Sequence, residues 1–179
     1  MYYRIILVGP GSSGKNYACK FLCDIFGMHF GCTYTTRPIR NGEVNGKDYF
    51  FINKEQFIKK LNNDEFYTWM TFNNGEWYYG IDKNDFYNPE NNVIIMTPGD
   101  IKQLLRSDRK KSLIVYFNIS EDVRKERLSK RNDADNVERR LQVDREDFKT
   151  FTDYDIEINK EDFTIEDLKE IYLTYRDTS

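Results

Sequence analysis

Apolar positions along this chain follow two periods, and the changes between them mark the predicted elements. Residues 3–8 are nearly continuous in apolar character, which is typical of a strand covered on both faces. Three later segments, residues 92–97, 112–119 and 154–159, are also predicted as strands. Helical patterns separate these segments, so the sequence predicts an α/β chain with a mainly parallel central sheet and right-handed crossovers.

The predicted helices are marked by their end signals. Residues 15–26 form a helical pattern with Gly27 placed as its C-terminal stop. Ser120 and Thr164 are predicted N-caps of two later helices. Further helices are expected at residues 54–61, 99–106 and 136–148, and the helix after Thr164 is expected to extend to about residue 176.

Residues 33–85 interrupt the alternation of strands and helices. Asn53, with Gln56 three residues later, is a capping-box start for a short helix. Residues 65–72 and 77–81 then read as two strands joined by an Asn-Gly turn. We therefore expect a small mixed α/β subdomain inserted into the main sheet.

Composition and charge narrow the function classes. The chain has 179 residues and a net charge of −3, which fits one domain and does not favour a nucleic-acid or anionic-membrane surface. No segment has the length of a membrane span, and the N-terminus runs into a strand without a signal peptide, so we expect a cytoplasmic protein. Cys19, Cys23 and Cys32 are interpreted as small apolar side chains, and the single histidine, His29, offers little for imidazole chemistry.

The segment "GPGSSGKN", residues 9–16, follows the first predicted strand and opens the first predicted helix. Its glycines allow successive N–H groups to turn around an anion, and the helix points its positive end at the same place. The alternative is an ordinary glycine-rich turn, but the position between strand and helix favours a phosphate-binding loop in which Lys15 reaches the outer phosphates. The predicted ATP-binding residues here are Gly9, Gly11, Ser12, Ser13, Gly14, Lys15 and Asn16.

Asn16 occupies the position where this loop pattern has Ser or Thr, whose hydroxyl contacts Mg²⁺. Mg²⁺ keeps several waters and rests on substrate phosphates, and an amide oxygen is a tolerable ligand for it. We therefore expect Mg²⁺ as the cofactor, with Asn16 as a weak ligand that acts mostly through water.

The stretch "TTRPIRNGEVNGKDYFF", residues 35–51, resembles the signature of guanylate kinases, which transfer a phosphoryl group from ATP to GMP. "EFYTW", "WYYG", "ERLSKRNDADNVERRL" and "YDIEIN" follow in the family's order, so the resemblance covers nearly the whole chain. It implies a three-layer α/β/α P-loop fold with a core at about 1–32, 86–120 and 150–179, a monophosphate-binding insertion at 33–85 and a helical lid at 121–149.

The resemblance also implies roles for particular residues. Arg37, Arg40, Tyr49 and Tyr79, with Thr33 in place of the family's Ser, would hold the acceptor phosphate through charge and hydroxyl donors. Glu43 would orient an arginine of the same site. The alternative is a set of solvated arginines and half-buried tyrosines.

The charged lid segment carries the predicted catalytic arginines, which act together with Lys15. Closure of such a lid neutralises charge on the phosphoryl group and excludes water. A charged helix is also typical of a plain solvated face. By resemblance the lid arginines are Arg131, Arg140 and Arg127, and Asn159 would lie near the adenine of ATP.

Three departures from the family pattern concern the acceptor: two lie at positions that contact its base, and one lies at a strand end that in the family helps to position metal and acceptor. Thr68 stands where the family has a guanine-reading Glu, and Ile81 where it has a second polar base contact. The strand end "IMTP", residues 95–98, replaces an acidic motif. One hydroxyl cannot accept two parallel hydrogen bonds as a carboxylate does, so we expect shifted or relaxed base choice.

Three functions follow from these observations. The first is transfer of the γ-phosphoryl group of ATP to GMP or dGMP, and the second is the same reaction on another or a deoxy monophosphate. The third is a catalytically inactive binding module for phosphorylated ligands, although the retained loop and lid arginines favour an enzyme. The expected partners are ATP and a nucleoside monophosphate, as monomer or homodimer, without nucleic acid or membrane.

Overall fold

The computed structural model describes residues 2–72, 74–130 and 137–177. Its central sheet has five strands in the order β2-β7-β1-β8-β9, and every neighbouring pair is parallel. This confirms the predicted α/β class with a mainly parallel sheet. The strands are β2 (His29–Gly31), β7 (Asn91–Met96), β1 (Arg4–Val8), β8 (Ser112–Phe117) and β9 (Ile156–Ile158).

Side chains of β1 alternate between the two faces of this sheet. Ile5 and Leu7 pack with α1 (Lys15–Phe26) and α8 (Ile165–Asp177) on one face. On this face the rings of Phe26 and Tyr172 stack with centroids 3.9 Å apart.

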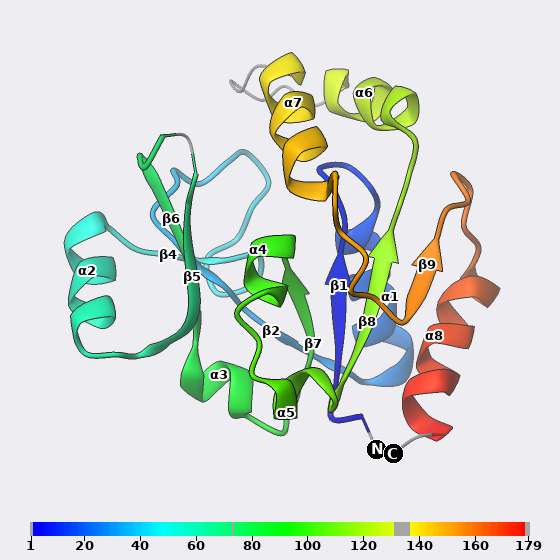
Figure 1. Cartoon of the computed structure of the whole chain (residues 1–179), viewed down its shortest axis with the longest axis horizontal. Coiled ribbons are helices and arrows are strands. Elements are labelled where there is room, and N and C mark those ends of the chain that lie inside the picture. Colours follow the sequence, from blue (N-terminus) through cyan, green and yellow to red (C-terminus); the bar gives the residue numbers. More distant parts are fainter. Residues whose placement is uncertain (1, 73, 131–136, 178–179) are drawn as a thin grey trace.

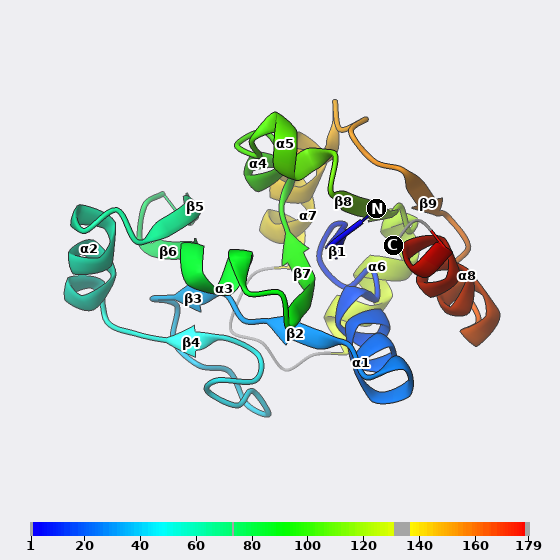
Figure 2. The ribbon, with the colours of Figure 1, turned by 90° about the horizontal axis from the view of Figure 1, so that it is seen from below.

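The other face of β1 carries Ile6 and Val8. They pack with Phe86 of α3 (Lys83–Tyr87) and with Ile101 of α4 (Pro98–Ile101). Helices therefore cover both faces of the sheet in three layers, as the view from below shows (Figure 2).

A second sheet forms the inserted subdomain, beside the central sheet (Figure 1). Its order is β4-β3-β6-β5, with one parallel and two antiparallel pairs. Phe57 of the adjoining helix is fully buried and stacks on Phe66. The elements are β3 (Tyr34–Thr35), β4 (Phe50–Phe51), α2 (Lys54–Asn62), β5 (Phe66–Phe72) and β6 (Trp77–Asp82).

Two helices, α6 (Glu121–Ser129) and α7 (Val137–Phe148), lie beyond the carboxyl ends of β1 and β8 (Figure 1). Ser120 occupies the N-cap position of α6, as predicted. Its hydroxyl, however, donates to Glu161 at 2.5 Å and makes no capping hydrogen bond to the helix. Thr164, in contrast, accepts from the N–H of Asp167 at 3.3 Å, as expected for an N-cap.

Sequence analysis located the long helices well and one short helix poorly. The helix at 15–26 ends at Gly27 in a left-handed conformation, as predicted. The single helix predicted at 99–106 is wrong, because the chain forms α4 and then a separate α5 (Arg106–Arg109). The break occurs where the N–H of Leu105 donates to the hydroxyl of Tyr67 at 3.0 Å.

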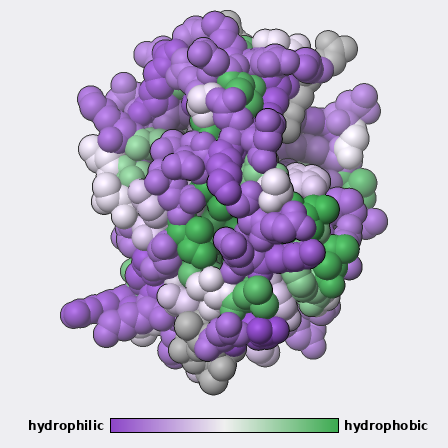
Figure 3. Space-filling model, turned by 90° about the vertical axis from the view of Figure 1, so that its right-hand side faces the viewer, coloured by the Kyte–Doolittle hydropathy of each residue, from purple (hydrophilic) through white to green (hydrophobic). Residues whose placement is uncertain are grey.

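The face that carries α8 is predominantly hydrophilic, with smaller hydrophobic areas between the polar side chains (Figure 3). Among the described residues, no helix combines the length and the apolar character that crossing a membrane requires.

Candidate active site

The carboxyl ends of the central strands open into a cleft of about 910 Å³. Its walls come from the loop after β1, from the inserted subdomain and from α7. Helix α1 follows β1 and covers one face of the sheet, whereas α4 follows the neighbouring β7 and covers the other. Ligands of parallel sheets bind where the chain turns to opposite faces in this way.

The phosphate loop, residues 9–16, is shaped by its glycines. A Cβ at Gly9 would lie 2.8 Å from the carbonyl oxygen of Phe117, which leaves no room for a side chain. Gly14 has a φ of +97°, which L-residues rarely adopt. Ser12 also has a positive φ of 61°, and its buried hydroxyl has no hydrogen-bond partner in the described part of the chain.

Lys15 lines the cleft while its ammonium group lies against the loop. Its Nζ donates to the carbonyl oxygens of Gly9 and Pro10 at 2.6 and 2.8 Å. Asn16 is exposed and lines the same cleft. Of the seven predicted ATP-binding residues of the loop, Gly9, Gly11, Lys15 and Asn16 line the cleft, whereas Ser12, Ser13 and Gly14 are not part of its lining.

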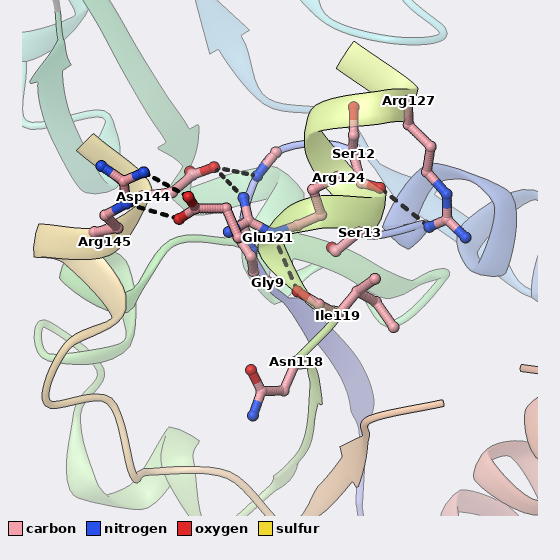
Figure 4. A network of polar contacts seen from close by, with 12 residues as sticks. Gly9, Ser12, Ser13, Asn118, Ile119, Glu121, Arg124, Arg127, Asp144 and Arg145 are labelled. Carbon is pink, nitrogen blue, oxygen red and sulfur yellow. Dashed lines mark hydrogen bonds and ion pairs between the residues drawn. The ribbon is translucent and has the colours of Figure 1, made fainter. Parts of the chain in front are cut away.

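A carboxylate from α7 reaches the phosphate loop. Asp144 accepts from the N–H of Gly11 at 3.0 Å and pairs with Arg124 of α6 at 2.8 Å (Figure 4). Arg124 is buried and donates to the carbonyl oxygen of Ile119 at 3.1 Å. Burial raises the pKa of Asp144, although Arg124 and the Gly11 N–H favour its charged form. A loop N–H of the kind that binds phosphate thus has an anionic protein partner.

The predicted lid arginines occupy different places. Arg127 donates to the carbonyl oxygen of Ser12 at 3.3 Å (Figure 4). It also donates to the carbonyl oxygen of Glu161 at 3.0 Å, so it joins the phosphate loop to the segment after β9. Arg140 of α7 lines the cleft. Arg131 lies outside the described residues.

On the opposite wall a buried arginine is held by a carboxylate. Arg37 donates from NH1 and NH2 to both carboxylate oxygens of Glu43, at 3.0 and 2.8 Å. It also donates to the hydroxyl of Tyr79 and the carbonyl oxygen of Pro38, at 3.1 and 2.7 Å. Burial opposes the charge on Glu43, but hydrogen bonds from Arg37 and from the Arg40 N–H lower its pKa below the ordinary value. A guanidinium has five N–H donors, so these four bonds leave one for a further acceptor.

Arg37, Arg40, Tyr49, Tyr79 and Thr33 all line the cleft, and we call them the clamp. The ring centroid of Tyr49 lies 5.4 Å from the guanidinium carbon of Arg37. Burial raises the pKa of Tyr49 to about 12, so its hydroxyl stays protonated at neutral pH. It can therefore donate to an anion without adding charge.

The positions associated with base reading lie beside the clamp. Ile81 is buried and lines the cleft. Thr68 is fully buried, and its hydroxyl donates to Oδ1 of Asp100 at 2.8 Å. Asp100 itself lines the cleft from the first turn of α4. Thr68 therefore contributes to this wall through Asp100.

Asn159 follows directly after the edge strand β9 and is exposed. The next residues contact the phosphate loop, because a Cβ at Gly14 would lie 2.7 Å from the ring of Phe163. Asn159 is thus placed on a segment that borders the loop, where the sequence predicts a contact to adenine.

Several charged residues of the cleft were missed from sequence, among them Asp100, Asp144 and Arg139. The position of Asp100 could have been inferred from sequence, since "TPGD" at residues 97–100 is a capping-box pattern that marks a helix start directly after an apolar strand. No sequence pattern placed Asp144 or Arg139 in the cleft, because mixed charges on a helix are typical of a solvated face.

The described residues hold no group of three or more His, Cys, Asp or Glu side chains arranged to bind a metal ion. Asn16, at the mouth of the loop, offers one amide oxygen. The residues therefore fit Mg²⁺ that arrives on a nucleotide and rests mainly on phosphate and water oxygens.

Comparison with known proteins follows this geometry. The family model described as guanylate kinase matches residues 2–175. A guanylate kinase of Campylobacter jejuni strain RM1221 is 31% identical over 163 residues, which cover 86% of this chain and 78% of that protein. A guanylate kinase of Fusobacterium nucleatum is 36% identical over 80 residues, so this alignment spans only 42% of that relative and 45% of this chain.

Among solved structures, the crystal structure of guanylate kinase from Anaplasma phagocytophilum superimposes with a TM-score of 0.70. The match covers 98% of this chain and 85% of that chain at 19% sequence identity. At this identity the likeness supports the fold alone.

Proposed function

This chain belongs to the guanylate kinase family, and on that basis we propose that it transfers the γ-phosphoryl group of ATP to GMP, giving ADP and GDP. The observation that carries the proposal is that the phosphate loop and the clamp line one and the same cleft. Two phosphate groups held at these two places would meet end to end, which is the positioning that the reaction needs.

The phosphate loop binds the donor nucleotide. Its N–H groups and the start of α1 hold the phosphates of ATP. The N–H of Gly11 exchanges Asp144 for a phosphate oxygen, and Lys15 exchanges the carbonyl oxygens of the loop for the outer phosphates. Both exchanges replace a partner that the protein itself provides.

The clamp binds the acceptor nucleotide. A monophosphate carries about two negative charges near pH 7. Arg40 supplies charge from the cleft wall, and the remaining N–H of Arg37 adds a second donor. The hydroxyls of Tyr49 and Tyr79 complete the site as neutral donors.

Phosphoryl transfer asks little covalent chemistry of the protein, so catalysis rests on positioning and charge neutralisation. Arg140, with Arg139 beside it, faces the cleft from α7 and balances charge on the transferred group. Helix α7 also limits access of water, which would otherwise hydrolyse ATP. Asn16, at the mouth of the loop, would hold Mg²⁺ that arrives with the nucleotide, and the ion would supply charge neutralisation for the phosphates.

A second candidate acceptor is a deoxy or non-guanine monophosphate. The observation in its favour is that Thr68 and Ile81, at the two base-reading positions, offer the cleft no carboxylate of their own.

The proposal places the reaction in the cytoplasm, where the free thiols of Cys19, Cys23 and Cys32 stay reduced.

A coupled assay of ADP release tests the proposal. Purified protein with Mg-ATP is given GMP, dGMP, AMP, CMP, UMP or TMP, and we expect the highest kcat/KM with GMP. A higher value with another monophosphate would support the second candidate. Absence of turnover with every acceptor, together with retained GMP binding, would contradict the kinase proposal and favour a phosphate-binding module.

A further inference from the structure

The wall of the cleft beyond the clamp contains a carboxylate, Asp100, to which the sequence analysis assigned no role. Asp100 lines the cleft together with Tyr79 and Ile81. It comes from α4, whereas the glutamate expected by resemblance would come from β5 at the position of Thr68. The hydroxyl of Thr68 donates to Asp100 at 2.8 Å, so the two positions are in direct contact.

Three donors fix the orientation of Asp100. Its Oδ2 accepts from the N–H and the hydroxyl of Thr97, at 2.9 and 2.7 Å. Its Oδ1 accepts from the hydroxyl of Thr68. A carboxylate has about four acceptor sites, so these contacts leave one, on Oδ1, for a donor in the cleft.

The position of Asp100 is unfavourable for a carboxylate without a use. Burial raises its pKa, although the Thr97 and Thr68 donors favour its charged form. The capping of a helix of only four residues gives a weak reason to bury a charge there. A ligand with N–H donors would satisfy the remaining acceptor site.

We propose that Asp100 reads the base of the acceptor nucleotide by accepting a hydrogen bond from an N–H group of guanine. The inference rests on the proposed function, because it takes the acceptor phosphate to lie in the clamp. Guanine presents its ring N1–H and its exocyclic amine side by side, whereas the N1 of adenine is an acceptor. A charged carboxylate only accepts, so it attracts the guanine edge and repels the N1 of adenine.

In this arrangement Thr68 is a positioning residue that acts through Asp100. Its hydroxyl holds Oδ1 in place and leaves the second acceptor site of that oxygen to the base. The carboxylate that reads the base and the residue at the expected glutamate position are thus joined by one hydrogen bond.

The test is the Asp100→Asn variant, with binding measured by calorimetry without ATP. We expect GMP affinity to fall about 10- to 100-fold, as for loss of a hydrogen bond to a charged group. AMP affinity should stay the same or rise, because the new amide can donate to the adenine N1. Competition by ribose 5-phosphate, which lacks a base, should be unchanged.

Asp108→Asn is the matched control. Asp108 is buried and accepts from the hydroxyls of Tyr67 and Tyr87 at 2.8 and 3.1 Å. It lies on α5 and interacts with Arg4 at the start of β1, away from the carboxyl ends of the strands. This variant should keep the GMP affinity of the wild type even where its melting temperature falls.

A second pair of variants separates positioning from packing. Thr68→Val removes the hydroxyl and should lower the ratio of GMP to AMP affinity, whereas Thr68→Ser should restore it. An equal ratio in both variants would contradict the role of Thr68 in orienting Asp100.

Either of two binding results would overturn the inference: a folded Asp100→Asn protein with wild-type GMP affinity, or equal losses for GMP, AMP and ribose 5-phosphate. The kinase proposal is judged separately by ADP release. Selective GMP binding through Asp100 without turnover would contradict the kinase and support this inference. Equal turnover of GMP and AMP, unchanged in Asp100→Asn, would support the kinase and contradict this inference.

Discussion

The two walls of the cleft hold their charged groups in opposite ways. In the clamp, Arg37 is held by hydrogen bonds to both carboxylate oxygens of Glu43. In the phosphate loop, Lys15 lies on loop carbonyl oxygens and the N–H of Gly11 is bound to Asp144. In the proposed function, a phosphate would join the first arrangement but would have to displace partners in the second.

This difference determines how much binding free energy each site is expected to gain from a phosphate. A site that is already organised loses little binding free energy to rearrangement. A site that must exchange partners gains only the difference between the free energy of the new contacts and that of the contacts it gives up. We therefore expect the clamp to respond mainly to loss of its own donors. The loop should respond to loss of its donors and also to loss of their competitors.

The largest effect is expected from Lys15→Ala. Removal of one group that stabilises the transferred phosphoryl lowers kcat by about 10²- to 10³-fold. Steady-state ADP release with saturating GMP measures it. Lys169→Ala, an exposed lysine of α8 near Glu166, is the control, and an unchanged kcat in Lys15→Ala would remove the loop from the mechanism.

Arg37→Ala should weaken acceptor binding whatever the base and also destabilise the fold. Glu43 would be left partly buried without its partner, and loss of one member of such a pair costs about 2–5 kcal/mol. Titration of the acceptor KM and a thermal melt measure the two effects. Arg40→Ala should raise KM with a smaller change in melting temperature, and equal melting losses in both variants would contradict the clamp described here.

Asp144→Asn should tighten the binding of ATP by about three- to tenfold, since a neutral amide competes less well with phosphate for the Gly11 N–H. Calorimetry with a non-hydrolysable ATP analogue measures this change. Asp147→Asn is the comparison variant, because Asp147 also lines the cleft from α7. Weaker ATP binding in Asp144→Asn would show that the carboxylate assists the nucleotide.

The smallest effect concerns pH. The folded pKa of Glu43 lies below its ordinary value of 4.5, so its pairing with Arg37 adds stability that is present above that value. The contribution is lost as the pH falls through the folded pKa. Melts between pH 7 and pH 3 should show a shallower acid-side loss for Glu43→Gln, and parallel curves would argue against a stabilising pair.

Much of the fold was predictable because its signals are local. Gly27 ends α1 in a left-handed conformation, and Asn53 with Gln56 forms the capping box of α2. The break between α4 and α5 was not predictable, because it depends on the hydroxyl of Tyr67, 38 residues away in sequence from Leu105.

The residues of the candidate site also fall into two groups, those with a local sequence signal and those placed by long-range contacts. Lys15 and Arg37 belong to short motifs whose chemistry can be interpreted from residue type and spacing. Asp100 meets Thr68 across 32 residues, and Asp144 meets Gly11 across 133, so both contacts exist only once the sheets and helices have assembled. Motifs therefore indicated the groups proposed to bind phosphate, whereas Asp100 and Asp144 became visible only in the tertiary structure.

Ser12 gives the loop one more property. A buried hydroxyl without a partner costs about 1–3 kcal/mol, and the loop contains one among the described residues. A phosphate oxygen that accepts from it would complete an interior that the polypeptide alone leaves incomplete. In the proposed function, a nucleotide bound in this way would act as a piece of the folded protein, and the melting temperature would report how much of it is bound.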